Sequence, residues 1–220
     1  MKEGLTKEQM AKRAAFELQD GFYVNLGIGL PTLVSNFIPE GRTIIFESEN
    51  GILGMGPLAS KEEEDPDLGN AGDEYVTTIS GASFFDSATS FAIIRGRHLD
   101  VTILGGFQVS EKGDLANWKL PERKVGSYGG ALDLAIGAKR VIVLMKHVTK
   151  DAKPRIVKEC TYPLTAKECV NLVITNLAVI EVTREGLTLK EIAPNWSVEE
   201  IQSLTEPNLK VDKRVKVMNL

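Results

Sequence analysis

The hydrophobic and polar positions near the start of the chain repeat with the spacing of an amphipathic helix. Met10, Ala14 and Leu18 recur every fourth position, so their side chains share one face. Thr6 and Gln9 have the spacing of a capping box, which satisfies backbone donors where a helix begins. We therefore predict a helix from Thr6 to about position 19. Its charged side chains are expected to stay in solvent: Lys7, Lys12, Arg13 and Glu17.

Short apolar runs further along the chain predict strands. They span residues 23–26, 43–46, 75–79, 101–104, 141–145, 178–182 and 187–189. Helical patterns lie between them, over residues 32–37, 84–96 and 132–135 and after the capping residues Thr165 and Ser197. Strands that alternate with helices predict an α/β fold with a mainly parallel, twisted sheet flanked by helices. Without a linker rich in Pro, Gly or Ser, residues 1–220 are expected to form a single domain.

The sequence gives more detailed expectations about burial for two of the predicted helices and for the tail of the chain. The helix after Thr165 is expected to turn Cys169, Leu172 and Val173 inward. The helix over residues 84–96 is expected to place four residues on one face: Phe84, Ala88, Phe91 and Ala92. The basic tail after Lys210 is expected to be peripheral.

Glycines follow several of the predicted strands. Gly27 and Gly29 follow the run at 23–26, Gly105 follows the run at 101–104, and Gly129 precedes a predicted helix. Ligand sites in parallel sheets lie beyond the carboxyl ends of the strands, so the four loops at Gly27, Glu49, Gly105 and Gly129 are expected to converge. The dinucleotide fingerprint is incomplete, because its third glycine is missing and Pro31 has no amide. A loop that lets amides approach another anionic or carbonyl group is the preferred interpretation.

Glu49 is the candidate nucleophile, because it stands where an apolar strand meets a glycine-containing turn. A carboxylate with a reference pKa of about 4.3 is ionised at neutral pH without a partner base. The alternative is a surface loop with solvated glutamates. Amides at Gly129 and Gly130 can accept developing negative charge, although a tight turn that needs positive φ is an equally good interpretation of these glycines.

Composition narrows the classes of function. A net charge of −4 gives no basic field for nucleic acid, and no apolar run is long enough to cross a bilayer or to act as a signal peptide. Cys160 and Cys169 have no metal-ligand spacing, so buried reduced thiols, no metal and a cytoplasmic location are expected. His98 and His147 are interpreted as structural residues rather than bases.

Several motifs together resemble one known family. They are residues 25–31 (NLGIGLP), 48–51 (SENG), 81–85 (GASFF), 117–118 (NW), 129–131 (GGA) with Asp133, and 163–165 (PLT). In this combination and order they resemble the beta subunit of family I 3-oxoacid CoA-transferases, from about residue 11 to residue 205. The resemblance implies the CoA-transferase (NagB/RpiA-like) fold.

The resemblance also implies an activity and a set of site residues. The activity is ping-pong transfer of coenzyme A from an acyl-CoA to a short-chain carboxylate such as acetoacetate. Glu49 matches the covalent carrier, and Gly130 matches the glycine whose amide stabilises the oxyanion. Asn25 and Asn50 match positions beside the nucleophile, and Gly27, Gly29 and Gly129 belong to the glycine loops that bind substrate or CoA. The implied partner is an alpha subunit in an α2β2 heterotetramer, with acyl-CoA as substrate and no permanently bound cofactor.

Three positions depart from the family pattern. Glu47 replaces a glutamine, Tyr128 replaces a methionine, and Arg97 replaces a glycine. If Tyr128 and Arg97 approach the acyl pocket, they affect the substrate more than the reaction type. Two carboxylates on one face of a strand raise each other's pKa, so a turn between Glu47 and Glu49 is expected.

Two alternative functions belong to other classes. Glu49 is also a possible general base of an acyl-CoA hydrolase or of a sugar-phosphate isomerase-like enzyme on a similar sheet. The other alternative is a noncatalytic module that binds an acyl or phosphate metabolite. An adduct on Glu49 distinguishes transfer from both.

Overall fold

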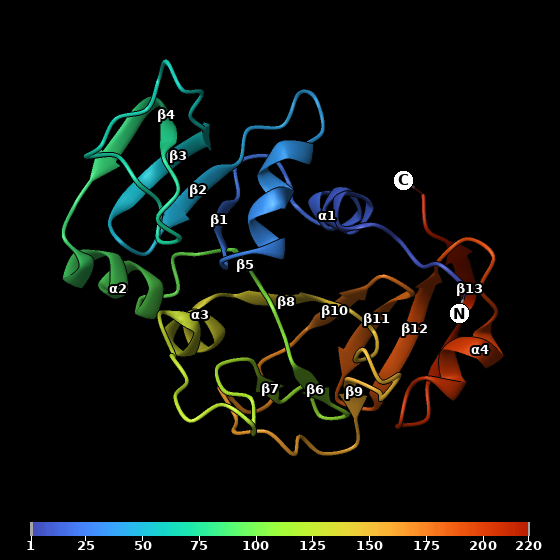
Figure 1. The fold of residues 1–220 in the computed structure, drawn as a ribbon. Coiled ribbons are helices and arrows are strands. Elements are labelled where there is room, and N and C mark those ends of the chain that lie inside the picture. The colour runs from blue at the N-terminus through green and yellow to red at the C-terminus, as the bar shows by residue number, and fades with distance from the viewer. Residues whose placement is uncertain (1, 220) are drawn as a thin grey trace.

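A computed structural model describes residues 2–219, in which a 10-stranded sheet runs through the whole molecule (Figure 1). Its strands are β1 (Tyr23–Leu26), β2 (Ile45–Ser48), β3 (Ile52–Leu58), β4 (Val76–Phe84), β5 (Val101–Leu104), β8 (Arg140–Met145), β10 (Leu172–Thr175), β11 (Ala178–Thr183), β12 (Gly186–Ile192) and β13 (Lys210–Val217). Their spatial order is β13-β12-β11-β10-β8-β5-β1-β2-β3-β4. A second sheet of three strands lies beside it, with β6 (Gln108–Ser110) between β7 (Leu115–Ala116) and β9 (Ile156–Val157).

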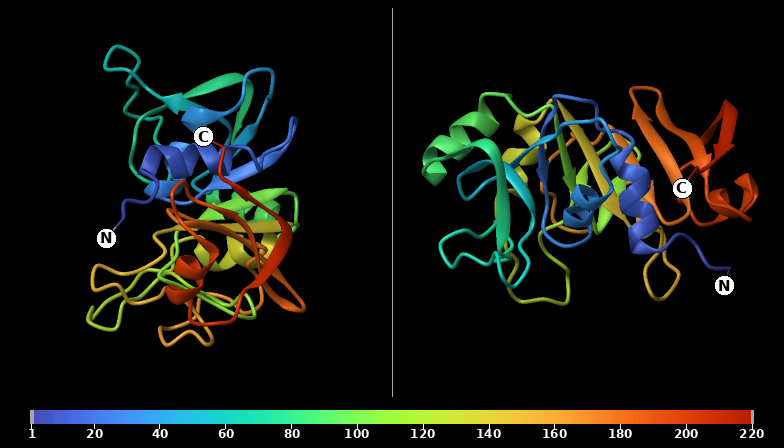
Figure 2. Two further views of the ribbon diagram at one scale, coloured as in Figure 1. Left: turned by 90° about the vertical axis from the view of Figure 1, so that its right-hand side faces the viewer. Right: turned by 90° about the horizontal axis from the view of Figure 1, so that it is seen from above.

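The centre of the large sheet is parallel. Strands β2, β1, β5, β8 and β10 pair in parallel in that order, whereas β3 and β4 on one side and β11 and β12 on the other pair antiparallel. The predicted α/β fold with a mainly parallel sheet is therefore confirmed, with antiparallel pairs on both sides of the centre that the sequence did not indicate. The view from above in Figure 2 shows the green β4 and the red β13 at opposite ends of the molecule.

Helices cover both faces of the sheet. Helix α1 (Lys7–Ala15) packs with the 3₁₀ helix η1 (Leu30–Phe37) on one face, and α3 (Ala131–Gly137) lies on the other beside α2 (Ser87–Arg95) (Figure 1). The last helix, α4 (Val198–Ser203), begins with the capping box predicted at Ser197. The capping box at Thr6 is also confirmed, although α1 ends at Ala15 instead of near position 19.

Strand β8 shows why the core has two halves. Ile142 and Leu144 pack into the cluster that contains α1, while Val141 and Val143 pack into the cluster that contains α3. Successive side chains of a strand point to opposite faces, so a strand that is apolar at every position fits only between two covered faces. Strand β8 therefore lies between the two helix-covered halves of the core.

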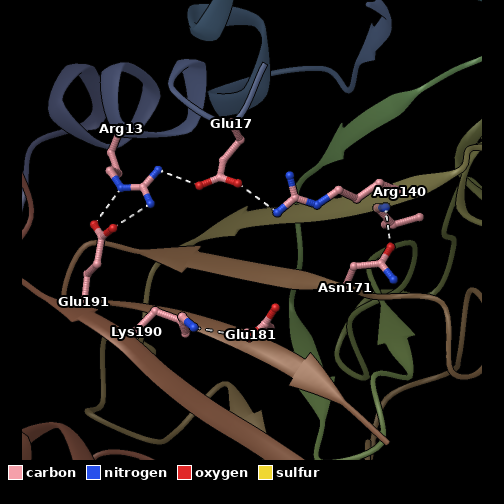
Figure 3. A network of polar contacts seen from close by, with 8 residues as sticks. Arg13, Glu17, Arg140, Asn171, Glu181, Lys190 and Glu191 are labelled. Atoms are coloured by element: carbon pink, nitrogen blue, oxygen red, sulfur yellow. Dashed lines mark hydrogen bonds and ion pairs between the residues drawn. The ribbon is translucent and has the colours of Figure 1, made fainter. Parts of the chain in front are cut away.

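Arg13 and Glu17 do not stay in solvent as predicted, because they join α1 to the sheet (Figure 3). Arg13 is 7% exposed and donates from Nε and Nη2 to the Glu191 carboxylate at 2.7 and 2.9 Å. Its Nη1 donates to Glu17 at 2.9 Å, and Arg140 donates to the other oxygen of Glu17 at 2.8 Å. Helical periodicity places Arg13 next to the buried face but cannot show a carboxylate on β12.

The helix predicted after Thr165 is wrong. The Thr165 hydroxyl donates to Asn117 Oδ1 at 2.6 Å instead of capping a helix. Glu168 adopts a φ of 48°, which interrupts a helix. Leu172 and Val173 are in strand β10 instead. Cys160 and Cys169 are free thiols, as predicted, but they are half-buried rather than buried.

Two further segments differ from the sequence expectations. Phe84 ends strand β4, and helix α2 begins only after its Asp86 cap, so the residues that α2 buries are Ser90 and Ile94. Ala88 and Ala92 are exposed. The tail after Lys210 is part of the large sheet, in which β13 pairs in parallel with β12 as an edge strand. Alternating charged and apolar residues are typical of such an edge.

Candidate active site

The carboxyl ends of the parallel strands β1, β2, β5 and β8 meet at one edge of the sheet. The loops that follow them surround a cavity of about 520 Å³ together with the loop before α3. Its lining includes six of the residues singled out in the sequence: Gly27, Glu49, Gly105, Tyr128, Gly129 and Gly130. The four loops expected to converge therefore do so, because parallel strands deliver their carboxyl ends to the same side.

Glu49 occupies a turn directly after β2. The Gly51 amide closes the turn by donating to the Ser48 carbonyl at 2.9 Å, and Gly51 has a φ of 121°. A Cβ on Gly51 would overlap the carbonyl oxygen of Phe85, whose amide donates to the Gly51 carbonyl at 3.0 Å. Only glycine permits this turn, which holds the half-buried Glu49 side chain at the cavity.

One amide nitrogen connects the two carboxylates of this strand end. The buried Asn25 side chain donates from Nδ2 to Oε2 of Glu47 at 2.8 Å and to Oε2 of Glu49 at 3.1 Å. Ser90 on α2 donates its hydroxyl to the other Glu47 oxygen at 2.6 Å. The turn expected between the two carboxylates begins after Ser48, and Asn25 bridges them from the neighbouring strand β1.

Burial raises the pKa of the Glu47 carboxyl above its ordinary range, and the nearby Glu49 charge raises it further. The hydrogen bonds from Ser90 and Asn25 act in the opposite direction. Glu47 is 1% exposed and does not line the cavity, so it supports Asn25 instead of meeting a ligand.

Gly130 brings the backbone against the Glu49 carboxylate. A Cβ at position 130 would lie 3.1 Å from Glu49 Oε1 and 3.3 Å from its Cδ. Gly130 precedes α3, and among residues 2–219 its amide has no hydrogen-bond acceptor. Gly129 has a φ of 47°, so the tight turn and the free amide, which the sequence presented as alternatives, occur together.

Two of the residues singled out in the sequence are not brought to Glu49. The exposed Asn50 side chain donates to the Gly69 carbonyl at 2.7 Å and does not line the cavity. Gly29 has a φ of 92° and lines a separate small cavity of about 90 Å³ next to η1. Both residues shape the turns that carry the site rather than the site itself.

The positions that depart from the family pattern lie in different places. Tyr128 lines the cavity and stacks on Trp118, with 3.9 Å between ring centroids. Arg97 is exposed outside the cavity, just beyond α2, with a φ of 60°. That backbone conformation favours glycine, so Arg97 affects local strain and not the pocket.

Several residues around the cavity escaped the sequence reasoning. Arg155 and Lys146 line it, and Ser90 contacts the buried carboxyl of Glu47. Arg155 follows a loop after β8, and its position in the sequence carries no periodic or motif signal. Only the pairing of β9 with β6 brings it to the end of β5.

Comparison with known proteins decides the family. Residues 7–204 match the family described as Coenzyme A transferase. The chain belongs to this family. The B subunit of a probable succinyl-CoA:3-ketoacid coenzyme A transferase from Bacillus subtilis is 49% identical over 95% of this chain and 97% of its own length. The B subunit of the 3-oxoadipate CoA-transferase of Pseudomonas putida is 50% identical over 91% of this chain and 94% of its own length.

Longer relatives contain the same unit. The mitochondrial succinyl-CoA:3-ketoacid coenzyme A transferase 2B of Mus musculus is 50% identical over 96% of this chain, which spans 42% of that protein. An acyl-CoA transferase from Escherichia coli O157:H7 superposes with a TM-score of 0.77 at 20% identity, covering 98% of this chain and 43% of the larger one.

The decarboxylase AibA/AibB shares the coenzyme A transferase fold, with a TM-score of 0.71 at 19% identity over 98% of this chain and 89% of its own. The fold by itself therefore does not decide the reaction. Within residues 2–219, no helix has the length and apolarity to cross a membrane, and no group of three or more His, Cys, Asp or Glu side chains is arranged to hold a metal ion.

Proposed function

We propose that this coenzyme A transferase chain is the beta subunit of a 3-oxoacid CoA-transferase that uses Glu49 as the covalent carrier. It would move coenzyme A between an acyl-CoA and a short-chain 3-oxo acid such as acetoacetate. The observation that carries the proposal is the position of the Glu49 carboxylate in the cavity, against the backbone of Gly130, whose amide has no acceptor within residues 2–219. The names of the relatives at about 50% identity support the 3-oxoacid class.

The chemistry needs a nucleophile, an oxyanion donor and a dry cavity. The Glu49 carboxylate attacks the thioester carbonyl, and the CoA thiolate leaves to give an acyl-glutamyl anhydride. The thiolate then attacks the glutamyl carbonyl, which releases the free acid and leaves a glutamyl-CoA thioester. A second carboxylate reverses the sequence and departs as the new acyl-CoA. A well-placed amide donor such as Gly130 contributes about 3 kcal/mol to each tetrahedral intermediate.

The other possible nucleophiles and bases of the described chain support a carboxylate route. Burial lowers the pKa of His147 to about 4, and its ring contacts Thr175 and Thr205 outside the cavity. Burial raises the pKa of Cys160 and Cys169 to about 12, so neither is a thiolate at neutral pH. Glu49 is the one carboxylate among the described residues that line the cavity.

We further propose that the partner of this chain is an alpha subunit, because relatives of similar length are named as B subunits of their enzymes and longer relatives contain additional chain. An α2β2 assembly in the cytoplasm is the expected form. The partner would close over Glu49 and exclude water, which would otherwise hydrolyse the anhydride. Coenzyme A enters as a substrate and not as a bound cofactor.

The test is to trap the intermediate. The complex of the two subunits is mixed with acetoacetyl-CoA, treated with borohydride or hydroxylamine, and digested to map the modified peptide. We expect the label on Glu49, and Glu49→Gln should lower transfer at least about 1,000-fold. Glu62→Gln in the exposed loop over residues 61–67 is the control for loss of a charge.

Other outcomes would identify the alternatives. Turnover without an adduct would favour hydrolysis or isomerisation with Glu49 as a base. If the wild-type complex shows no turnover and the Glu49→Gln complex still binds ligand, the chain is a noncatalytic binding module.

A further inference from the structure

The cavity that contains Glu49 also contains a cation without a counterion. Among the described residues that line it, the charged side chains are Glu49, Lys146 and Arg155. Lys146 is exposed, whereas Arg155 is half-buried. No Asp or Glu within residues 2–219 lies close enough to form an ion pair with Arg155.

The guanidinium of Arg155 has unused donors. Its Nη1 donates to the Gly106 carbonyl at 3.3 Å, and its buried Nε has no hydrogen-bond partner in the described chain. Burial lowers the pKa of this guanidinium, yet arginine remains protonated in proteins. A half-buried cation with unpaired donors is costly unless a ligand supplies negative charge.

The backbone around Arg155 is fixed on both sides. Its amide donates to the His147 carbonyl at 3.1 Å, and its carbonyl accepts from the Val109 amide at 2.9 Å. Strand β9, which follows directly, pairs with β6. The side chain therefore extends from a rigid element toward the Gly105 and Gly106 turn, which lines the same cavity as Glu49.

We infer that Arg155 binds the distal carboxylate of an acyl group whose proximal carbonyl is attacked by Glu49. The guanidinium fork pairs with a carboxylate through two parallel hydrogen bonds, which a monocarboxylic acyl chain cannot offer. Arg155 is thus a specificity residue that favours dicarboxylic acyl groups such as succinyl. This inference rests on the function proposed above.

The same cavity receives both acyl groups of a ping-pong cycle, and this provides an internal comparison. Succinyl-CoA carries a second carboxylate, whereas acetoacetyl-CoA carries a neutral keto group. An anion on coenzyme A itself, such as its pyrophosphate, is the other possible partner of Arg155. That partner is common to every acyl-CoA, so the two sources give different results.

The experiment measures kcat/KM for formation of the enzyme–CoA thioester from succinyl-CoA and from acetoacetyl-CoA, in the complex of the two subunits. We expect Arg155→Gln to lower the ratio of the two values about 100-fold, the usual loss when a buried charge pair is broken. Arg155→Lys, which keeps the charge without the fork, should recover part of the ratio. Lys153→Gln removes a positive charge from the exposed side of the same loop and should leave the ratio unchanged.

Two results would overturn the inference. An equal loss of kcat/KM for both donors in Arg155→Gln would mean that the guanidinium binds coenzyme A or supports the fold. If Arg155→Gln keeps the wild-type kcat/KM for both donors, the guanidinium binds neither the acyl carboxylate nor coenzyme A. Arg155→Lys separates a folding defect from a binding defect, because only binding changes the ratio between donors. Failure of the proposed function is distinct, since wild-type enzyme would then form no adduct on Glu49 with either donor.

Discussion

Gly130 lies so close to Glu49 that a Cβ at position 130 would be 3.1 Å from the Oε1 atom of the carboxylate. The backbone φ of −81° at Gly130 is accessible to every residue, so the glycine is required by this approach and not by the turn. The pairing joins two loops that are far apart in the sequence, one after β2 and one before α3.

Gly130→Ala should therefore impair the reaction more than the fold. The new methyl group would push the Glu49 carboxylate by tenths of an ångström. We expect kcat to fall about 100-fold, because a displaced reacting group costs that much, while the melting temperature changes little. Gly69→Ala, where the nearest atom to the new Cβ is 3.8 Å away, is the matched control. A variant with wild-type kcat would show that this approach has no part in catalysis.

Glu47→Gln should change the pH dependence of stability. The pKa of Glu47 is raised in the folded protein, so the folded state binds this proton more tightly than the unfolded state. Its contribution to the free energy of unfolding is then largest at low pH and declines as pH rises from about 4.3 through the raised pKa. Glutamine keeps an acceptor for Asn25 without the charge.

The measurement is urea unfolding of wild type and Glu47→Gln at about pH 5 and about pH 8. We expect the variant to gain about 1 kcal/mol relative to wild type at the higher pH and less at the lower pH. Glu62→Gln on the exposed loop should show no such difference. A gain that is equal at both pH values would mean that Glu47 does not titrate in this range.

Arg13→Met should destabilise the fold without altering the site. The substitution leaves the Glu191 carboxylate on β12 with no guanidinium, and Glu17 keeps only Arg140. We expect a loss of about 2 kcal/mol in the free energy of unfolding, because the pair is largely buried, and an unchanged kcat for the folded enzyme. Lys12→Met, at an exposed position of the same helix, is the comparison. Equal stability of the two variants would show that the network contributes nothing.

The pH dependence of this network has the opposite sign to that of Glu47. Burial raises the pKa of Glu17, but Arg13 and Arg140 lower it by more, so its net shift is downward. Its contribution is complete above the ordinary carboxyl range and is lost as pH falls below about 4.3. In Arg13→Met this acid-dependent part should shrink, which the same unfolding series extended to low pH would detect.

Local signals explain which predictions from the sequence are confirmed. The capping boxes at Thr6 and Ser197 depend on residues three positions apart, and both form as predicted. The same spacing at Thr165 does not produce a helix cap, since the Thr165 hydroxyl donates to Asn117, which is distant in the sequence. Motif spacing is reliable only where no tertiary partner competes for the capping group.

The site shows the same division. An apolar strand that runs directly into a glycine-containing turn marks Glu49, so the candidate carboxylate was visible in the sequence. The family resemblance placed Asn50 beside it, yet the Asn50 side chain donates to the Gly69 carbonyl. Two residues that are adjacent in one turn, such as Glu49 and Asn50, can point their side chains in different directions.

By itself, the sequence of this chain determined the alternation of strands and helices, the glycine turns at the strand ends and the carboxylate at position 49. The family resemblance implied that Asn25 and Gly130 lie beside it. Only the tertiary structure decided that Asn25 donates to both Glu47 and Glu49 and that Arg155 lines the same cavity as Glu49. The physical reason is that hydrophobic periodicity reports which face of an element is buried, whereas the order β8-β5-β1-β2 depends on how the elements pack together. That order places the ends of distant segments within reach of one another.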